Sequence, residues 1–460
     1  MPDKPHLALD LAAFAHLRAE DEPWLAEAFV APADFEFLVG PRSTVLYGEG
    51  GSGKTTLLHM IAHTAPAEAF CLFWTPRFEP DESPDNPDLW AEGFLRACAV
   101  VLCSHFAHHP QVWSTLPEWA QGFLADFFRR YREPLWAIEG ARLRAGLDEA
   151  GRAWLEEVMA PPAAPTPYAI TGFSRARVLE YLAEAILAAG WQSLWVLADG
   201  FQAWEQQEDP VIEERVRQGL RRWVSSLTLL DQRVFTLKLA LPLSWQEALQ
   251  DMRAIRTRRL EEYVLTWTQE ELAAIVSKRL GLAAGRPDFH LEAICPTCDL
   301  RRWLWRYAGA NPRRWLSQAR SLYQAYRQAG GRPLTPEEWR QLNRRLAPYL
   351  TLVGNEKGVV YVGPHRVELA DSLYRVLAYL YGEDRVCSRE ELYFIAYKGL
   401  ERVPRPEEMG WEATEVWRGT MDTVIWRLRK AIEPDPDHPM FIQTVRGQGV
   451  KLARTRAIRP

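Results

Sequence analysis

The residues best suited to chemistry lie in a glycine-rich segment close to the start of the chain. The segment Gly48-Glu-Gly-Gly-Ser-Gly-Lys-Thr55 matches the pattern G-x-x-x-x-G-K-[ST] in full. Glycines let successive backbone N–H groups converge on a phosphate at a helix N-terminus. In this pattern the lysine reaches the β- and γ-phosphates and the hydroxyl after it ligates Mg²⁺. The segment therefore predicts an ATP–Mg²⁺ site formed by Gly48, Gly50, Gly51, Ser52, Gly53, Lys54, Thr55 and Thr56.

The sequence around this segment supplies the elements that the phosphate site needs. Ser43–Tyr47 has the composition of a short buried strand, and Thr55–Ala62 has that of a helix. A strand, a glycine-rich loop and a helix in this order place the loop amides at a helix N-terminus. The alternative, a flexible surface turn, does not explain this context.

A second group of candidate residues follows the apolar strand Ser193–Ala198. Asp199 ends that strand and is the candidate acid that holds Mg²⁺ through water; a strand-end or N-cap aspartate is the alternative. Gln202 stands three residues after Asp199, where P-loop ATPases of the kind that this sequence resembles usually carry a second acid. A glutamine can orient a water but cannot take its proton. Glu205 is the fallback base. The candidate catalytic residues are therefore Lys54, Asp199, Gln202 and Glu205, and we expect a weak ATPase with slow hydrolysis.

The C-terminal region has a pattern typical of nucleic-acid binding. Thr414–Ile432 predicts a helix with one apolar stripe, followed by the hairpin Phe441–Leu452 that turns at its glycines. A helix that fits the major groove and a basic hairpin beside it form a DNA-docking geometry. From Arg418 to the end, nine basic residues oppose four acidic ones, which gives +5. The alternative is a winged helix used only for protein contacts.

The remaining elements position these groups. Strands at Ser43–Tyr47, Phe70–Trp74, Ser193–Ala198 and Val234–Leu241 alternate with helices, which predicts an α/β fold with a parallel sheet. Thr75–Asp88 is predicted to be a loop, Leu89–Met159 a helical insertion and Pro161–Pro167 a breaker. After Thr266 only helices are expected, beginning with a capping box at Thr268. The predicted domains are an N-terminal lead-in (1–33), a P-loop core (34–265, with the insertion at about 89–160), a helical lid (266–346) and a winged helix-turn-helix domain (350–460).

Composition excludes several classes of protein. The 460 residues carry a net charge of −5 and are 47% hydrophobic, as in an ordinary globular chain. We find no apolar run of the roughly 18 residues that a membrane span needs, and no signal peptide at Met1–Lys4, so we expect a cytoplasmic protein with no membrane partner. Six cysteines do not form a disulfide framework. Cys295-Pro-Thr-Cys298 has the spacing of half a zinc site, but no second pair of ligands follows it, so the favoured interpretation is a turn before a helix near Asp299.

The region from about Asp34 to Ala329 resembles the STAND and AAA+ branch of P-loop ATPases. The resemblance implies that Lys238 is a polar sensor on its strand. Gly309-Ala-Asn-Pro-Arg-Arg314 is similar to the G-x-P-R segment of the lid, which implies that Arg313 or Arg314 senses the γ-phosphate; solvent-facing arginines are the alternative. The cluster Arg256, Arg258 and Arg259 is either an arginine finger or, as we favour, a solvated helix face.

The segment from about Leu350 to Thr455 resembles the OmpR/PhoB winged-helix domain. The similarity is carried by Met421–Lys430 and Thr444–Gly449. It implies that Thr423, Trp426 and Arg427 face bases, that Arg418, Arg429 and Lys430 face phosphates, and that Arg446 enters the minor groove; Lys451 is a further cation of the hairpin. Two positions depart from the family. Val450 replaces an aromatic residue, which we expect to loosen the wing, and the longer, proline-rich loop Gly399–Gly410 argues against the family's polymerase contact.

Together these features predict an ATP-controlled DNA-binding regulator, in the manner of a transcriptional regulator. The alternative is an AAA+ DNA-remodelling, replication-initiator-like or transposition-helper ATPase that its winged helix anchors to DNA. The expected partners are ATP, Mg²⁺ and double-stranded DNA, and homo-oligomerisation is left open. The operator and the upstream signal are not encoded in any motif.

Overall fold

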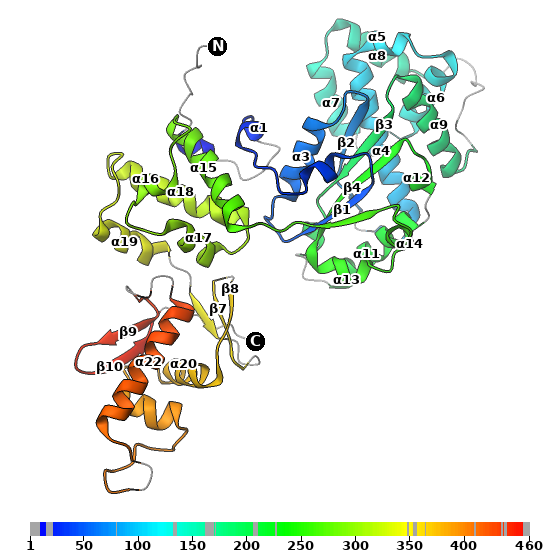
Figure 1. Cartoon of the computed structure of the whole chain (residues 1–460). Helices are drawn as coiled ribbons and strands as arrows, with labels where there is room; N and C mark the ends of the chain where they lie inside the picture. The colour runs from blue at the N-terminus through cyan, green and yellow to red at the C-terminus, as the bar shows by residue number, and fades with distance from the viewer. Residues whose placement is uncertain are drawn as a thin grey trace. The chain divides into compact units, whose positions relative to one another are not determined.

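The computed structural model divides the chain into two compact units (Figure 1). The sheet unit comprises Arg18–Ala26 and Ala31–Thr266, and the C-terminal unit comprises Met1–Leu17, Glu27–Val30 and Trp267–Pro460. The structure describes residues 10–14, 22–79, 81–131, 136–161, 170, 172–205, 210–225, 228–346, 349–352, 357–363, 365–408, 411–433, 436 and 439–453. Several segments lie outside the described residues: 162–167 of the predicted breaker Pro161–Pro167, Pro434, the first nine residues and the arginines after Ala453.

The sheet unit is built on five parallel strands in the order β2-β3-β4-β1-β5. The strands are β1 (Thr44–Gly48), β2 (Ala69–Trp74), β3 (Ser193–Ala198), β4 (Phe235–Pro242) and β5 (Glu261–Val264). β1, β3 and β4 are almost wholly buried, which explains their continuous apolar sequences. The predicted α/β fold and four of its strands are confirmed. The sequence does not predict β5, because Glu-Glu-Tyr-Val is the composition of a partly exposed edge strand.

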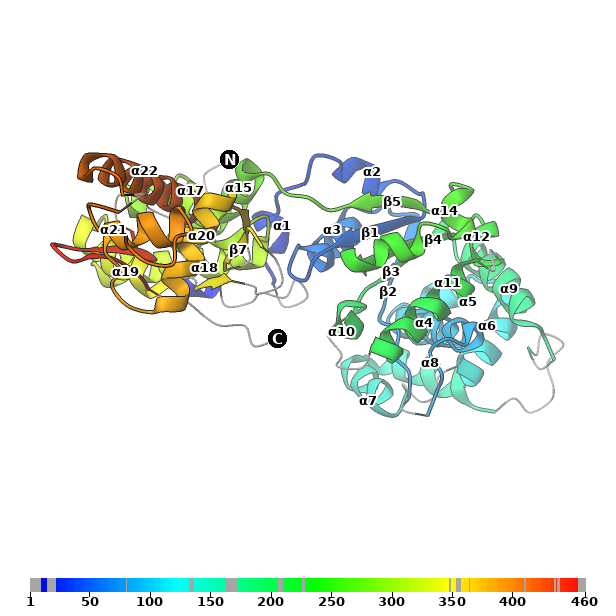
Figure 2. The ribbon, with the colours of Figure 1, turned by 90° about the horizontal axis from the view of Figure 1, so that it is seen from below.

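Helices surround the sheet. They are α2 (Phe35–Val39), α3 (Lys54–Thr64), α9 (Arg175–Ala188), α10 (Gln202–Glu205), α11 (Pro210–Ser225), α12 (Thr228–Asp231), α13 (Gln246–Leu249) and α14 (Arg253–Arg256). The predicted insertion forms α4 (Pro87–His108), α5 (Pro110–Ser114), α6 (Glu118–Tyr131), α7 (Trp136–Gly146) and α8 (Glu149–Met159). Figure 2 shows α4, α6 and α8 grouped together, and their buried aromatic side chains join the core of the sheet.

Helix α4 starts earlier than the sequence suggests and is unusually apolar. Asn86 caps it by accepting a hydrogen bond from the Asp88 amide, with Pro87 in the first turn, so the predicted loop ends two residues sooner. By length and composition α4 is the one described helix that passes for a membrane span, contrary to the expectation that no apolar run is long enough. Half of its most apolar window is buried, and Trp90, Phe94 and Phe106 pack in the core. It is therefore placed as a core helix.

Within the C-terminal unit, the segment predicted to form a lid contains only helices among its described elements, and we refer to it as the lid. Its helices are α15 (Gln269–Ala284), α16 (Leu291–Ile294), α17 (Leu300–Ala308), α18 (Pro312–Gln328) and α19 (Pro336–Leu346). The capping box predicted at Thr268 is present. The lid also holds part of the N-terminal lead-in, the turn of helix Asp10–Phe14. There Arg279 donates to the carbonyl of Ala13 at 3.3 Å, and Arg327 forms an ion pair with Asp10.

The last part of the chain contains the helix and the terminal hairpin that the sequence predicts there. A three-stranded antiparallel sheet, β6 (Leu350–Leu352), β7 (Val359–Val362) and β8 (His365–Glu368), precedes α20 (Asp371–Glu383) and α21 (Arg389–Glu391), which a π-helical stretch extends to Tyr397. Helix α22 (Thr414–Ile432) and the hairpin β9 (Ile442–Val445) and β10 (Gly449–Leu452) follow. Ser388 begins α21 with a capping box.

The expectation of a loosened wing is wrong. Val450 is fully buried, in the same core as Met421 and Leu428. Its backbone also pairs with Cys387: the Cys387 amide donates to the Val450 carbonyl at 2.8 Å, and the return bond is 2.9 Å. A smaller side chain at this position thus fills the core while the backbone fixes the hairpin.

Candidate functional site

The glycine-rich loop adopts the shape that its sequence predicts. It leaves β1 at Gly48 and enters α3 at Lys54. Gly51 and Gly53 have φ angles of 82° and 97°, which residues other than glycine rarely adopt. A Cβ on Gly48 would lie 2.5 Å from the hydroxyl of Ser52. Gly51 and Gly53 are thus required by the fold of the loop, which lies at the N-terminus of α3.

Lys54 is folded back into the loop. Its side chain is buried, and its ammonium group donates to the carbonyls of Gly48 at 2.6 Å and Glu49 at 2.9 Å. It also donates to the side-chain oxygen of Gln202 at 3.1 Å. The positive charge therefore lies within the loop, where phosphate oxygens would replace these acceptors.

Thr55 and Asp199 are brought together from distant parts of the chain. The Thr55 hydroxyl donates to the Asp199 carboxylate at 2.5 Å. The other carboxylate oxygen accepts from the amide of Gly200, whose φ of 92° turns the chain sharply after β3. A hydroxyl and a carboxylate next to phosphate-binding amides are hard oxygen donors, which suit Mg²⁺. The residues present therefore fit a Mg²⁺–nucleotide complex.

The two candidates for the hydrolytic position are separated by the structure. Gln202 opens α10 and contacts Lys54, so it lies at the phosphate loop. The Glu205 carboxylate instead accepts a hydrogen bond from the Ser244 hydroxyl at 2.6 Å. Ser244 follows the end of β4, whose last residue Pro242 is aligned with Gly48. Sequence reasoning misses Ser244, because a serine after an apolar strand carries no motif; only the strand register reveals it.

Lys238 is not a nucleotide sensor. In the sheet register it lies opposite Thr44, at the start of β1, whereas the phosphate loop leaves the other end of that strand. Its ammonium group donates to the carbonyls of Gly40 at 2.8 Å and Arg42 at 2.7 Å. Burial lowers the pKa of Lys238 to about 7. This lysine therefore holds the segment before β1, and its role is structural.

The remaining arginines of the ATPase resemblance are divided between the two units. Arg313 and Arg314 are exposed in the first turn of α18, where Asn311 caps the helix and accepts from the Arg314 amide at 3.2 Å. They belong to the C-terminal unit and the phosphate loop to the sheet unit, so γ-phosphate sensing stays a prediction. Arg259, in the sheet unit, forms an ion pair with Asp231. This ion pair favours the interpretation of the arginine cluster as a solvated helix face over its interpretation as an arginine finger.

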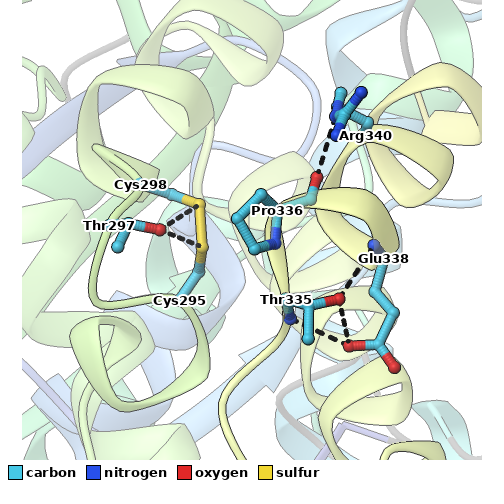
Figure 3. Close-up of a disulfide and its surroundings, with 7 residues drawn as sticks. All are labelled: Cys295, Thr297, Cys298, Thr335, Pro336, Glu338 and Arg340. Atoms are coloured by element: carbon cyan, nitrogen blue, oxygen red, sulfur yellow. Dashed lines mark hydrogen bonds between the residues drawn. A yellow bond between two sulfur atoms is a disulfide. The ribbon is translucent and has the colours of Figure 1, made fainter.

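Cys295 and Cys298 form a disulfide across the predicted turn (Figure 3). The turn precedes α17, which Asp299 caps, so the expected helix start is confirmed. The hydroxyl of Thr297 lies near both sulfur atoms. No cluster of three or more metal-ligating side chains occurs among the described residues, so nothing there completes a zinc site. The other four cysteines form no disulfide in the structure.

Helix α22 presents the predicted base-facing residues to solvent. Thr423, Trp426 and Arg427 are all exposed, and Trp426 retains 54% of its accessible surface. The Lys430 ammonium nitrogen lies 4.3 Å from the centre of the Trp426 ring. Arg418 is exposed two turns earlier, with its guanidinium 5.4 Å from the ring of Trp417. Exposed positions of α22 thus combine a large aromatic ring with cations, which are groups that can contact a nucleic acid.

Arg429 does not fit the phosphate-facing role that the resemblance implies. It is half-buried and donates from two nitrogens to the carbonyl of Ile442, at 3.1 and 2.8 Å, and to the Thr444 hydroxyl at 2.7 Å. Desolvation lowers the pKa of its guanidinium. Arg429 therefore ties α22 to strand β9 of the wing.

The end of α22 is a junction between helix, wing and lid. The fully buried carboxylate of Glu433 accepts hydrogen bonds from the amides of Met440, Phe441 and Ile442, at 2.7, 2.8 and 2.6 Å. Burial raises the pKa of Glu433, although these hydrogen bonds act to lower it. Arg306 of α17 donates to the carbonyl of Glu433 and, at 3.4 Å, to that of Lys430. A cation at the last carbonyls of a helix interacts favourably with the helix dipole.

The wing carries the two predicted hairpin cations. Arg446 is exposed in the turn between β9 and β10, and Lys451 is half-buried on β10. The turn itself uses Gly447 and Gly449, with φ of 76° and 148°. A Cβ on Gly449 would meet the Cys387 carbonyl at 2.0 Å, so only glycine permits this approach.

The parallel sheet and the loop between β1 and α3 give the chain the fold of a P-loop NTPase. No protein-family model matches the chain, and no curated protein matches its sequence. Among solved structures it is similar to the crystal structure of Cdc6p from Pyrobaculum aerophilum. The TM-score is 0.35 and the identity 13%, over 97% of this chain and 94% of that one.

Proposed function

We propose that this protein binds ATP–Mg²⁺ in its phosphate loop and double-stranded DNA through its winged helix, and that it hydrolyses ATP slowly. The observation that carries the proposal is the meeting of Lys54, Thr55, Asp199 and Gln202 at the carboxyl ends of β1 and β3. In doubly wound sheets, ligands bind at these ends of the strands. Lys54 and the loop amides would hold the phosphates, and Thr55 and Asp199 would hold Mg²⁺. Bound Mg²⁺ would neutralise charge on the transferred phosphate.

Slow hydrolysis follows from the residue at the reacting position. Gln202 has an amide where a carboxylate would take the proton of the attacking water. It can orient that water, and its contact with Lys54 keeps it close to where the γ-phosphate would lie. Glu205 is engaged by Ser244, so the structure gives it no contact with the loop among the described hydrogen bonds.

The DNA-binding part of the proposal rests on the surface of α22. Its apolar stripe is buried, while Thr423, Trp426, Arg427 and Lys430 point away from the core. Arg427 is the base-reading candidate because a guanidinium forks onto guanine. Lys430 and Arg418 are the phosphate-facing candidates, and Arg446 reaches from the wing.

Two forms of this function remain. The first is a cytoplasmic regulator in which the ATP state sets DNA affinity, as a transcription factor would use it. The second is an AAA+ ATPase that remodels DNA or loads other factors on it. The Arg306 contact favours the second, because it joins the lid directly to the end of the DNA-binding helix. A protein that uses ATP to remodel DNA needs a connection between its ATPase part and its DNA-binding part.

The test measures both activities on the full chain. Calorimetry with ATP–Mg²⁺ and Lys54→Ala establishes nucleotide binding, and titration of one long DNA duplex with ATP or ADP present establishes the effect of nucleotide on DNA. Turnover that DNA stimulates, with assembly into rings or filaments, supports the remodelling ATPase. An ATP-dependent change in DNA affinity without stimulated turnover supports the regulator. Absence of ATP binding by the wild type overturns both.

A further inference from the structure

The lid has an unusual excess of positive charge. From Asp299 to Leu346 there are eleven arginines, no lysine and three acidic residues, or a net +8, although the whole chain carries −5. Four of these arginines are neutralised locally: Arg301 by Glu292, Arg327 by Asp10, Arg332 by Glu338 and Arg340 by Glu337. Arg306 donates a hydrogen bond to the Glu433 carbonyl at the end of α22.

Six arginines remain, and all are exposed. Within the described part of the chain their side chains have no ion pair and no hydrogen bond: Arg302, Arg313, Arg314, Arg320, Arg344 and Arg345. Each guanidinium presents a planar fork of donors that matches a phosphate. Because these like charges repel one another, binding of a polyanionic partner stabilises such a surface more than water does.

The positions of these arginines indicate which kind of polyanion binds to them. Arg302 lies one helical turn before Arg306 on α17, so both project from the same side of the helix. Arg306 reaches the carbonyls at the end of α22, the helix that carries Lys430. Arg344 and Arg345 end α19, just before the strands of the winged helix. Exposed arginines of α17 and α19 therefore lie close to two places where the lid meets the segment with α22: the Arg306 contact and the chain connection after α19.

We propose that the lid is a second, sequence-independent contact surface for the phosphate backbone of duplex DNA, extending the footprint of the winged helix. The inference rests on the proposed function, since it takes duplex DNA as the ligand of the winged helix. The exposed arginines of α17, α18 and α19 form this surface. They contact phosphates and read no bases, so they add affinity for every sequence alike.

The salt dependence of DNA binding tests this surface. A protein that neutralises Z phosphates shows a slope of log K against log salt of about −0.9Z. The full chain is titrated with one long duplex at several salt concentrations, as wild type and as the triple variant Arg302→Gln, Arg320→Gln, Arg344→Gln. We expect the variant to bind more weakly and its slope to shrink by about 0.9 for each phosphate that it no longer neutralises. Arg313 and Arg314 are left unchanged because they are also candidates for nucleotide sensing.

A variant of equal charge is the control. Arg301→Gln, Arg332→Gln, Arg340→Gln also removes three charges from the lid, but these arginines are paired with glutamates. We expect its slope to stay near that of the wild type. Equal flattening by both triple variants would show an effect of net charge only and would overturn the proposal. So would an unchanged slope in the test variant, or binding of the wild type to phosphatidylserine vesicles but to no duplex.

The winged-helix variant Arg427→Ala, Lys430→Ala separates this inference from the proposed function. If it weakens binding and the test variant leaves the slope unchanged, the winged helix alone binds DNA and the inference fails. If it changes nothing while the test variant removes binding, the lid binds DNA and the proposed role of the winged helix fails. Circular dichroism of each variant verifies that the exposed substitutions leave the fold intact.

Discussion

The ammonium nitrogen of Lys54 lies 3.1 Å from the side-chain oxygen of Gln202, a residue 148 positions further along the chain. The contact joins the phosphate loop to the turn after β3, where Asp199 bonds the Thr55 hydroxyl. It also shows how the loop keeps the lysine charge satisfied: by oxygen atoms of its own backbone and of one amide side chain. A phosphate that enters the loop must replace that amide.

Lys54→Ala should remove most of the ATP affinity. A hydrogen bond to a charged group contributes about 1.5–3 kcal/mol, so the affinity should fall at least about tenfold. Calorimetry with ATP–Mg²⁺ measures it. Because the side chain is buried, thermal unfolding of the variant must be recorded as well. A properly folded variant with wild-type affinity would show that the loop does not bind the nucleotide.

Gln202 should limit the rate of hydrolysis. Wild-type turnover should fall below the roughly 1–100 s⁻¹ typical of kinases. Gln202→Glu should raise it, because a carboxylate can accept the proton of the attacking water. Single-turnover measurements at saturating ATP separate this step from product release. The matched variant is Glu205→Gln: fast wild-type hydrolysis that Glu205→Gln abolishes would assign the base to Glu205 instead.

Lys238 should make the stability of the sheet depend on pH. Its pKa is about 7 in the folded protein and ordinarily 10.5, so between these values the unfolded chain binds the extra proton. Stability from this group therefore rises with pH across that window, by up to about 1.4 kcal/mol per unit. Hydrogen exchange of β1 and β4 amides, compared with Lys238→Met at each pH, measures it. Lys238→Met should gain its largest advantage near pH 7 and lose it towards pH 10. A difference independent of pH would contradict the shifted pKa.

The sequence could predict those elements whose residues interact locally. The phosphate loop, the capping box at Thr268 and α22 all follow from short patterns, and each is present. The roles of Lys238 and Arg429 could not be predicted, because each depends on a partner fixed by tertiary structure. The role of Lys238 is determined by the register of its strand with β1. The role of Arg429 is determined by the approach of β9 to α22. A family pattern gives the residue type at a position but not the direction of its side chain.

Base-reading and phosphate-contacting residues should respond differently to substitution. Arg427→Ala should relax the preference at one base pair by about 1–3 kcal/mol. Lys430→Ala should weaken all duplexes alike and reduce the salt slope by about one unit. Arg446→Ala should have its largest effect where a narrow A·T-rich minor groove flanks the site. Titration of a preferred and a scrambled duplex at several salt concentrations distinguishes the three. If none of them changes binding of the full chain, the winged helix serves protein contacts.

Arg429→Met should destabilise the wing and leave the salt slope unchanged. The methionine keeps an apolar stem of similar length but cannot form the bonds to the Ile442 carbonyl and the Thr444 hydroxyl. Hydrogen bonds from a charged donor contribute about 1.5–3 kcal/mol, so amides of β9 should exchange at least about tenfold faster. Hydrogen exchange of peptides covering Ile442–Val445 is the suitable measurement, because a chain of two units need not unfold in one step.

Lys430→Met is the matched control for that experiment. Lys430 is the next residue of α22, but its ammonium group lies over the Trp426 ring instead of bonding to β9. Its substitution should leave exchange in the wing unchanged and flatten the salt dependence, the reverse of Arg429→Met. Should Arg429→Met instead flatten the salt dependence and spare the exchange rates, the side chain turns outward on DNA and contacts phosphate as the family resemblance implies. The pair of variants thus decides whether the bond between helix and wing persists when DNA is bound.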